Sequence, residues 1–224
     1  MNIIILFALL PCVLLGALVY RKDPHKEPGK GVLRAFAAGM LSVVVTLALQ
    51  SWVPYGYWER FTFTRAFLCA GLVEETAKFL TFYLMIWRFS EFDEPYDGIL
   101  YMAYIGLGFA FVENITYLVR YSGELASTAV GRALFATPGH FLFGVAMGYF
   151  MGRARFIHTR SLRRVYMFSG WLAAFLLHGT YDFLLMQQDV IGSDTLRGVL
   201  TLAFYAFDLV LWRIGLKRMR MLND

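Results

Sequence analysis

The sequence predicts an all-α membrane protein, a bundle of about seven transmembrane helices. Of its 224 residues, 58% are apolar and only 17% are charged, a balance typical of a protein whose surface faces lipid rather than water. The apolar residues gather in long runs, and most Lys and Arg residues stand in the short segments between those runs. Multi-pass membrane proteins keep their charges in such loops.

The apolar runs are long enough to cross a bilayer, which requires about 20 residues in a helix. Seven segments meet this requirement, at residues 2–20, 33–53, 66–87, 98–119, 131–151, 167–186 and 196–212. We expect the first segment to remain as a membrane helix, because Arg21 and Lys22 follow it where a signal peptide would carry small residues for cleavage. The connections are short, so no separate soluble domain is expected.

The distribution of basic residues predicts the orientation in the membrane. Placing the N-terminus outside leaves fourteen Lys and Arg residues on the cytoplasmic side and five on the outer side. This bias follows the positive-inside rule and puts the C-terminus in the cytoplasm.

Composition also argues against other classes of function. The net charge of +5 does not indicate a nucleic-acid partner, because the basic residues mark loop ends at a lipid surface. Cys12 and Cys69 each lie in an apolar run without a second thiol at metal-binding spacing. They predict neither a disulfide framework nor a thiolate zinc site.

The candidate functional residues are seven ionisable side chains within four consecutive predicted spans, where burial in lipid is costly. They are Glu74, Glu75 and Lys78 in the third span, Glu113 in the fourth, His140 in the fifth, and His178 and Asp182 in the sixth. Counting about 1.5 Å per residue places the Glu and His residues about 9–14 Å below the outer surface. We therefore expect them to share one layer.

Helical spacing predicts local pairs among these residues. Glu74 and Lys78 are four residues apart and share a helix face, whereas Glu75 points about 100° away. This spacing predicts that one Glu is tied to Lys78 while the other is free. His178 and Asp182 are also four apart, so Asp182 can accept the ring N–H of the histidine.

A ridge of small residues continues from His140. Gly144, Gly148 and Gly152 follow it at steps of four, a pattern that lets helices pack closely in lipid. His140 is thus expected to face a neighbouring helix.

Four motifs in consecutive spans resemble the PrsW intramembrane proteases, which are relatives of the type II CAAX prenyl proteases. The motifs are EETAK from Glu74 to Lys78, GFAFVEN with Glu113, TPGHFLFG around His140, and LHGTYDF around His178 and Asp182. The similarity covers about residues 66–186. It implies a catalytic four-helix core in 66–186. The apolar runs place two N-terminal transmembrane helices in 1–65 and a last helix with a basic cytoplasmic tail in 187–224.

The resemblance implies hydrolysis of a peptide bond in a membrane-anchored protein, near the outer face of a prokaryotic plasma membrane. First-site cleavage of an anti-sigma factor in stress signalling is the activity associated with the family. The expected partners are therefore a membrane-anchored protein substrate and membrane lipid.

Two mechanisms remain open at this point. In the first, a glutamate is the general base and a histidine stabilises the oxyanion. In the second, His140, His178 and Glu113 or Glu75 hold a divalent metal such as zinc, and a remaining glutamate is the base. Spacing does not decide between them, because the residues come from separate helices.

The alternative from another class is a proton- or ion-coupled membrane carrier that uses the same buried Glu and His cluster. A carrier predicts polar residues along a path across both leaflets, whereas the strongest cluster here occupies one layer. A non-catalytic scaffold would not explain the buried charges. For Glu74 and Lys78, the simplest alternative is a structural buried ion pair.

Overall fold

The protein is helical along its length in the computed structural model, which describes residues 2–222 and contains no strand in that range. Residue 1 and residues 223–224, at the ends of the predicted regions 1–65 and 187–224, lie outside the described residues. The prediction of an all-α membrane protein is confirmed.

Each of the seven predicted spans corresponds to a helical run in the described residues. These runs are α1 (Asn2–Lys22), α2 (Gly29–Gln50), η1 (Arg65–Leu72) with α5 (Val73–Met85), α6 (Pro95–Arg120), η3 (Arg132–Ala136) with α8 (Thr137–Arg155), α9 (Arg160–Val190) and α10 (Asp194–Met221). Short helices occupy the connections: α3 (Tyr55–Trp58), α4 (Thr62–Thr64), η2 (Ser122–Glu124) and α7 (Leu125–Gly131).

Several helix ends differ from the ends of the predicted spans. The segment 33–53 starts too late and ends too late, since α2 begins at Gly29 directly after Pro28 and stops at Gln50. The segments 167–186 and 196–212 are too short, because α9 and α10 continue through basic turns. Hydropathy marks where lipid ends, whereas backbone hydrogen bonding lets a helix continue into water.

Five helical runs are long and apolar enough to span a membrane: Asn2–Lys22, Gly29–Gln50, Pro95–Arg120, Ser122–Arg155 and Asp194–Met221. The predicted spans 66–87 and 167–186 are helical but are not among these five. They carry Glu74, Glu75 and Lys78 in one case and His178 and Asp182 in the other, and these side chains make them less apolar. The two helices that are not apolar enough to qualify thus carry five of the seven candidate residues.

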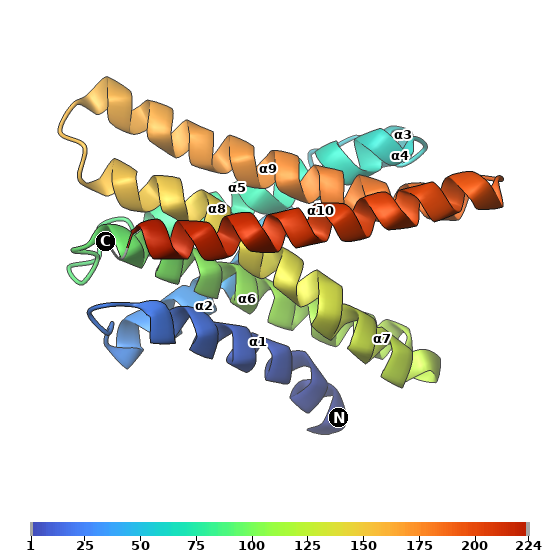
Figure 1. The fold of residues 1–224 in the computed structure, drawn as a ribbon, viewed down its shortest axis with the longest axis horizontal. Coiled ribbons are helices and arrows are strands. Elements are labelled where there is room, and N and C mark those ends of the chain that lie inside the picture. The colour runs from blue at the N-terminus through green and yellow to red at the C-terminus, as the bar shows by residue number, and fades with distance from the viewer. Residues whose placement is uncertain (1, 223–224) are drawn as a thin grey trace.

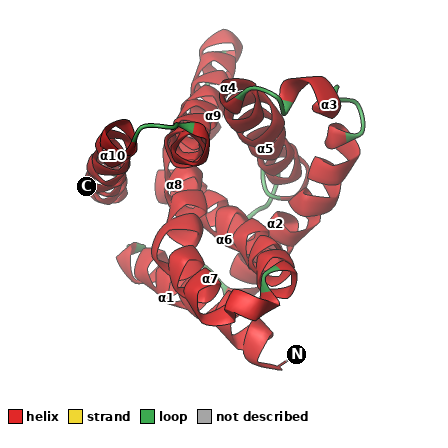
Figure 2. Ribbon diagram, turned by 90° about the vertical axis from the view of Figure 1, so that its right-hand side faces the viewer, coloured by secondary structure: helices red, strands yellow, loops and turns green. Residues whose placement is uncertain are grey.

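The helices surround a central pair, α6 and α8 (Figures 1 and 2). Helices α1 and α2 pack on α6, while α9 and α10 pack on α8. Helix α5 closes the bundle between α2 and α9, as the end-on view of Figure 2 shows.

Helices α6 and α8 meet along a glycine seam. The seam consists of Gly98 and Gly106 in α6 and Gly144, Gly148 and Gly152 in α8. A Cβ atom built on Gly148 would lie 2.3 Å from the carbonyl oxygen of Gly98, and one on Gly106 would lie 2.3 Å from that of His140. The predicted small-residue ridge is confirmed, and backbone contact fixes the height of His140 against α6.

Two π-helical segments directly precede the helices that carry candidate residues. The segment η1 leads into α5, and η3 leads into α8. Pro138 at the start of α8 lacks an N–H, and its ring crowds the carbonyl four residues earlier, which a wider turn accommodates. Such widened turns are frequent at functional sites.

Candidate active site

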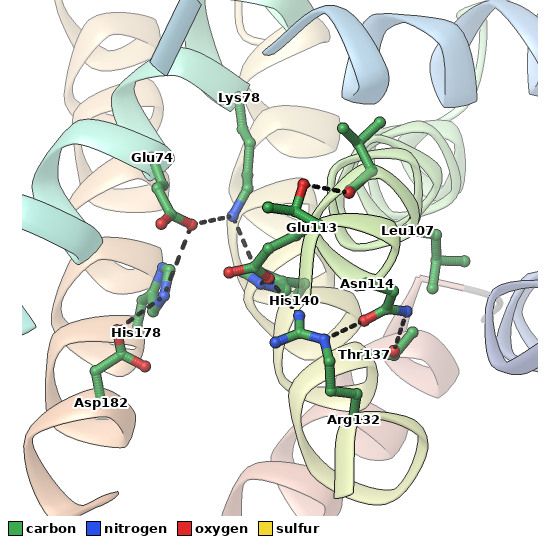
Figure 3. A network of polar contacts seen from close by, with 12 residues as sticks. Glu74, Lys78, Leu107, Glu113, Asn114, Arg132, Thr137, His140, His178 and Asp182 are labelled. Atoms are coloured by element: carbon green, nitrogen blue, oxygen red, sulfur yellow. Dashed lines mark hydrogen bonds and ion pairs between the residues drawn. The ribbon is translucent and has the colours of Figure 1, made fainter. Parts of the chain in front are cut away.

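Side chains from four helices converge on one buried polar cluster (Figure 3). The cluster contains Glu74, Glu75 and Lys78 from α5, Glu113 from α6, His140 from α8, and His178 and Asp182 from α9. The structure therefore brings all seven candidate residues together.

Lys78 joins the two glutamates of α5. Its Nζ lies 2.7 Å from Oε1 of Glu75 and 3.7 Å from Oε2 of Glu74. Glu75 is fully buried and makes the shorter contact with Lys78. Both glutamates therefore contact Lys78, and neither is free as the helical spacing predicted. Positions three and four residues away share a helix face, so spacing could not tell which glutamate makes the short contact.

His178 is oriented mainly by Glu75. Its Nδ1 lies 2.9 Å from Oε1 of Glu75, whereas its Nε2 lies 3.5 Å from Oδ2 of Asp182 and 3.9 Å from Oε2 of Glu74. The ring stacks on Phe143 with centroids 4.8 Å apart. The expected contact with Asp182 exists at ion-pair distance, but the shorter contact to the ring comes from another helix.

His140 has a polar partner at each ring nitrogen. Its Nδ1 lies 3.0 Å from Nζ of Lys78, and its Nε2 lies 2.8 Å from Oε2 of Glu113. If the ammonium of Lys78 donates to Nδ1, the proton of a neutral imidazole is on Nε2 and is donated to Glu113. A ligand bound through either nitrogen would take the place of one of these partners.

Arg132 and Asn114 extend the site and were missed by the sequence analysis. Nη2 of Arg132 lies 2.6 Å from Oε2 of Glu113, and its Nε donates to Oδ1 of Asn114 at 2.5 Å. Nδ2 of Asn114 in turn donates to Oγ1 of Thr137 at 3.0 Å. Arg132 was counted only as an outer-loop charge, although its position inside the predicted span 131–151 was the signal that could have identified it.

A cavity of about 570 Å³ opens onto the cluster. Its polar lining includes Glu74, Glu113, Arg132, His140, His178 and Asp182. Glu75 and Lys78 do not line it. They contact two residues that do, since Glu75 pairs with His178 and Lys78 contacts His140. The volume is in the range of sites that bind small ligands.

Three lining residues have the arrangement of metal ligands. Glu74, His140 and His178 each offer one ligand atom, and these atoms all lie within 4.8 Å of one another. Oε2 of Glu74 is buried without a hydrogen-bond partner. Two imidazoles and a carboxylate form a zinc donor set, so these residues fit such an ion. Glu113, expected among the ligands, lies outside this group and contacts Arg132 and His140 instead.

The family model and the relatives that match this chain all carry the name PrsW. The family model described as PrsW family intramembrane metalloprotease matches residues 27–211. Protease PrsW of Geobacillus kaustophilus is 40% identical over 180 residues, covering 80% of this chain and 78% of the relative. The Oceanobacillus iheyensis protein of the same name is 35% identical over 214 residues, covering 96% and 93%.

A third relative, Protease PrsW of Bacillus subtilis, is 36% identical over 176 residues, covering 78% of this chain and 79% of its own length. No solved structure matches the chain. The buried Glu and His cluster, the multi-pass helical fold and these matches agree: the chain belongs to the PrsW family of intramembrane proteases and is a membrane-embedded peptidase.

Proposed function

We propose that this peptidase cleaves a single-pass membrane protein in the outer half of the membrane, as the first cut of an anti-sigma factor in stress signalling. Residues 66–186 form the catalytic core in this proposal. With the N-terminus outside, as the fourteen-to-five basic asymmetry favours, Arg65, Tyr121 and Asp189 of the cavity lining stand at the outer end of the bundle.

The observation that carries the mechanism is the pair of carboxylates on either side of His178. Glu75 contacts Nδ1 at 2.9 Å, and Nε2 faces Oε2 of Glu74 at 3.9 Å. A carboxylate that accepts a hydrogen bond from Nδ1–H fixes the tautomer and leaves the Nε2 lone pair for a metal. We therefore assign Glu74, His140 and His178 as ligands of a divalent metal such as zinc. When bound, zinc supplies Lewis acidity for peptide hydrolysis.

Glu113 is the proposed general base. It lines the cavity, and its side chain, 23% exposed, is more accessible than those of Asp182, Glu74 and Glu75. In the proposed step its carboxylate takes a proton from the attacking water and returns it to the amide nitrogen as the C–N bond breaks.

Arg132 is proposed to stabilise charge in this step. Its guanidinium holds Glu113 at 2.6 Å and also lines the cavity. A fixed cation there favours the ionised form of the base and the negative charge that develops on the scissile carbonyl oxygen.

The test uses purified protein reconstituted in liposomes with a single-pass anti-sigma factor as substrate. Mass spectrometry of the products is expected to find a cut in the outer half of the transmembrane segment or just outside it. A Glu113→Gln variant should yield no product. A cut at the cytoplasmic end would contradict the proposed site depth, and cleavage of unrelated single-pass proteins at the same rate would contradict the proposed substrate class.

A further inference from the structure

A second acidic cluster lies at the other end of α6. It is built from Asp23 and Glu27 in the α1–α2 connection, Asp93 and Glu94 before α6, and Asp97 in the first turn of α6. Asp97 and Glu113 are sixteen residues apart in α6, or about 24 Å at 1.5 Å per residue. The acidic cluster is therefore separate from the active site.

Asp97 has one satisfied and one unsatisfied carboxylate oxygen. Oδ2 accepts the backbone N–H groups of Asp93 at 3.0 Å and Glu94 at 2.8 Å. Oδ1 is buried without a hydrogen-bond partner, in a residue that is 0% exposed. Oε1 of Glu94 is also buried without a partner. Buried polar atoms are normally paired, so two such oxygens in one cluster point to a ligand.

The carboxylates are close enough to share a cation. One oxygen each from Asp23, Glu94 and Asp97 lies within 4.8 Å of the other two, and the same holds for Glu27, Asp93 and Asp97. Oxygen ligands bind Ca²⁺ at 2.3–2.6 Å, so ligands on opposite sides of an ion stand about 5 Å apart. The spacing therefore matches an all-oxygen coordination shell.

Three nearby basic side chains contact atoms other than the two unpaired oxygens. Nζ of Lys26 donates to the backbone carbonyl oxygens of Tyr20 at 2.9 Å, Arg21 at 3.1 Å and Asp23 at 2.5 Å. Lys30 pairs with Glu91 at 2.8 Å. His25 contacts Glu94 from the exposed side, at Oε2 rather than the unpaired Oε1.

We infer that Asp23, Glu94 and Asp97 bind a hard divalent cation, Ca²⁺ or Mg²⁺, with Glu27 and Asp93 completing the oxygen shell. The ion fastens the α1–α2 connection to the start of α6. This donor set contains oxygen alone, in contrast to the two imidazoles of the active site, so the two sites select different ions.

The experiment titrates purified full-length protein, stripped of metal, with Ca²⁺ and with Mg²⁺ separately by calorimetry. Asp97→Asn and Asp23→Asn are the test variants, and Asn at 97 keeps an oxygen for the two backbone N–H groups. Glu91→Gln is the matched control, because this neighbouring carboxylate pairs with Lys30 outside the cluster. Glu74→Gln tests independence from the active site.

Saturable binding of about one ion per chain by one of the two cations is expected, weakened at least about tenfold in both Asn variants and unchanged in both Gln variants. Absence of saturable binding in the wild type would overturn the inference, as would unaltered affinity in the Asn variants. Loss of binding in Glu74→Gln would assign the ion to the active site and also overturn it. If Asp97→Asn does not fold, Asp23→Asn decides.

Discussion

Glu75 and His178 form a buried pair in which the carboxylate Oε1 lies 2.9 Å from the imidazole Nδ1. The same oxygen lies 2.7 Å from Nζ of Lys78. Glu75 thus holds two side chains of the site without lining the cavity itself, and its effect on chemistry passes through His178.

Glu75→Gln is expected to weaken zinc binding by about 10–100-fold, the usual cost of losing a group that orients a metal ligand. The amide oxygen of Gln can still accept a hydrogen bond from His178, but it no longer neutralises the charge of Lys78. Competition titration with a zinc chelator measures the change. Asp182→Asn is the comparison, and we expect a smaller effect because Asp182 lies 3.5 Å from His178. Equal effects of the two variants would contradict the orienting role of Glu75.

Glu74→Gln and His178→Ala should each remove bound metal. Wild-type protein purified with zinc should hold about one ion per chain in the active site, and each variant about a tenth of that or less, because a three-ligand site loses a direct ligand. Elemental analysis measures the content. Chelation should also stop cleavage by the wild type, and added zinc should restore it. Cleavage that persists in chelator would instead favour the glutamate mechanism without metal.

Glu113 and His140 should behave as one unit in cleavage assays. Glu113→Gln and His140→Ala should each reduce kcat severely, and the double variant should lose little more, because residues that act together are strongly non-additive. Independent, multiplicative losses would contradict a shared role of Glu113 and His140 in one catalytic step.

Arg132→Gln should lower kcat by about 10²–10³, as for loss of one group that stabilises an oxyanion. KM should change less, because the proposed charge develops in the transition state. The measurement is cleavage rate against substrate concentration in liposomes. A change confined to KM would indicate that Arg132 binds substrate without assisting the chemistry.

Gly148→Val should destabilise the protein by about 3 kcal/mol through overpacking, because the added Cβ would lie 2.3 Å from the carbonyl oxygen of Gly98. Gly131→Val is the matched control, since a Cβ there meets nothing within 4 Å. Thermal unfolding in detergent compares the two. Similar melting temperatures would show that α6 and α8 can separate without cost.

Orientation can be tested with single cysteines at Ser122 and His158, which are exposed in the two connections of α8. Cys12 and Cys69 are buried and would be replaced by Ala in the starting protein. A membrane-impermeant reagent should label Ser122→Cys in intact cells and His158→Cys only after lysis. The reverse pattern would move the cavity to the cytoplasmic side.

The sequence was informative where one physical quantity decides the outcome. Apolar runs identified the seven long helical runs of the described residues, and the cost of burying charge identified Glu74, Glu113, His140 and His178. Contacts between side chains on different helices depend on how the helices are rotated against one another. The sequence alone does not give this rotation. For that reason the short contact of His178 in α9 with Glu75 in α5 was not foreseen.

The role of Arg132 was missed for a related reason. A basic residue near a span end serves equally well as a topology signal or as a partner of a buried acid. Only the fold shows that η3 turns Arg132 toward Glu113 and Asn114.

The glycine seam determines on which flank a substrate can approach. Helices α6 and α8 touch through backbone at Gly148 and Gly98, so no side chain can rotate aside and that flank is closed. On the opposite flank, a second hollow between η3, α9 and α10 shares Tyr181 with the active-site cavity. Its wall includes Phe204, whose ring packs 4.9 Å from that of Tyr181. Side chains rather than backbone therefore line this flank, and their size would limit which membrane segments reach the cavity.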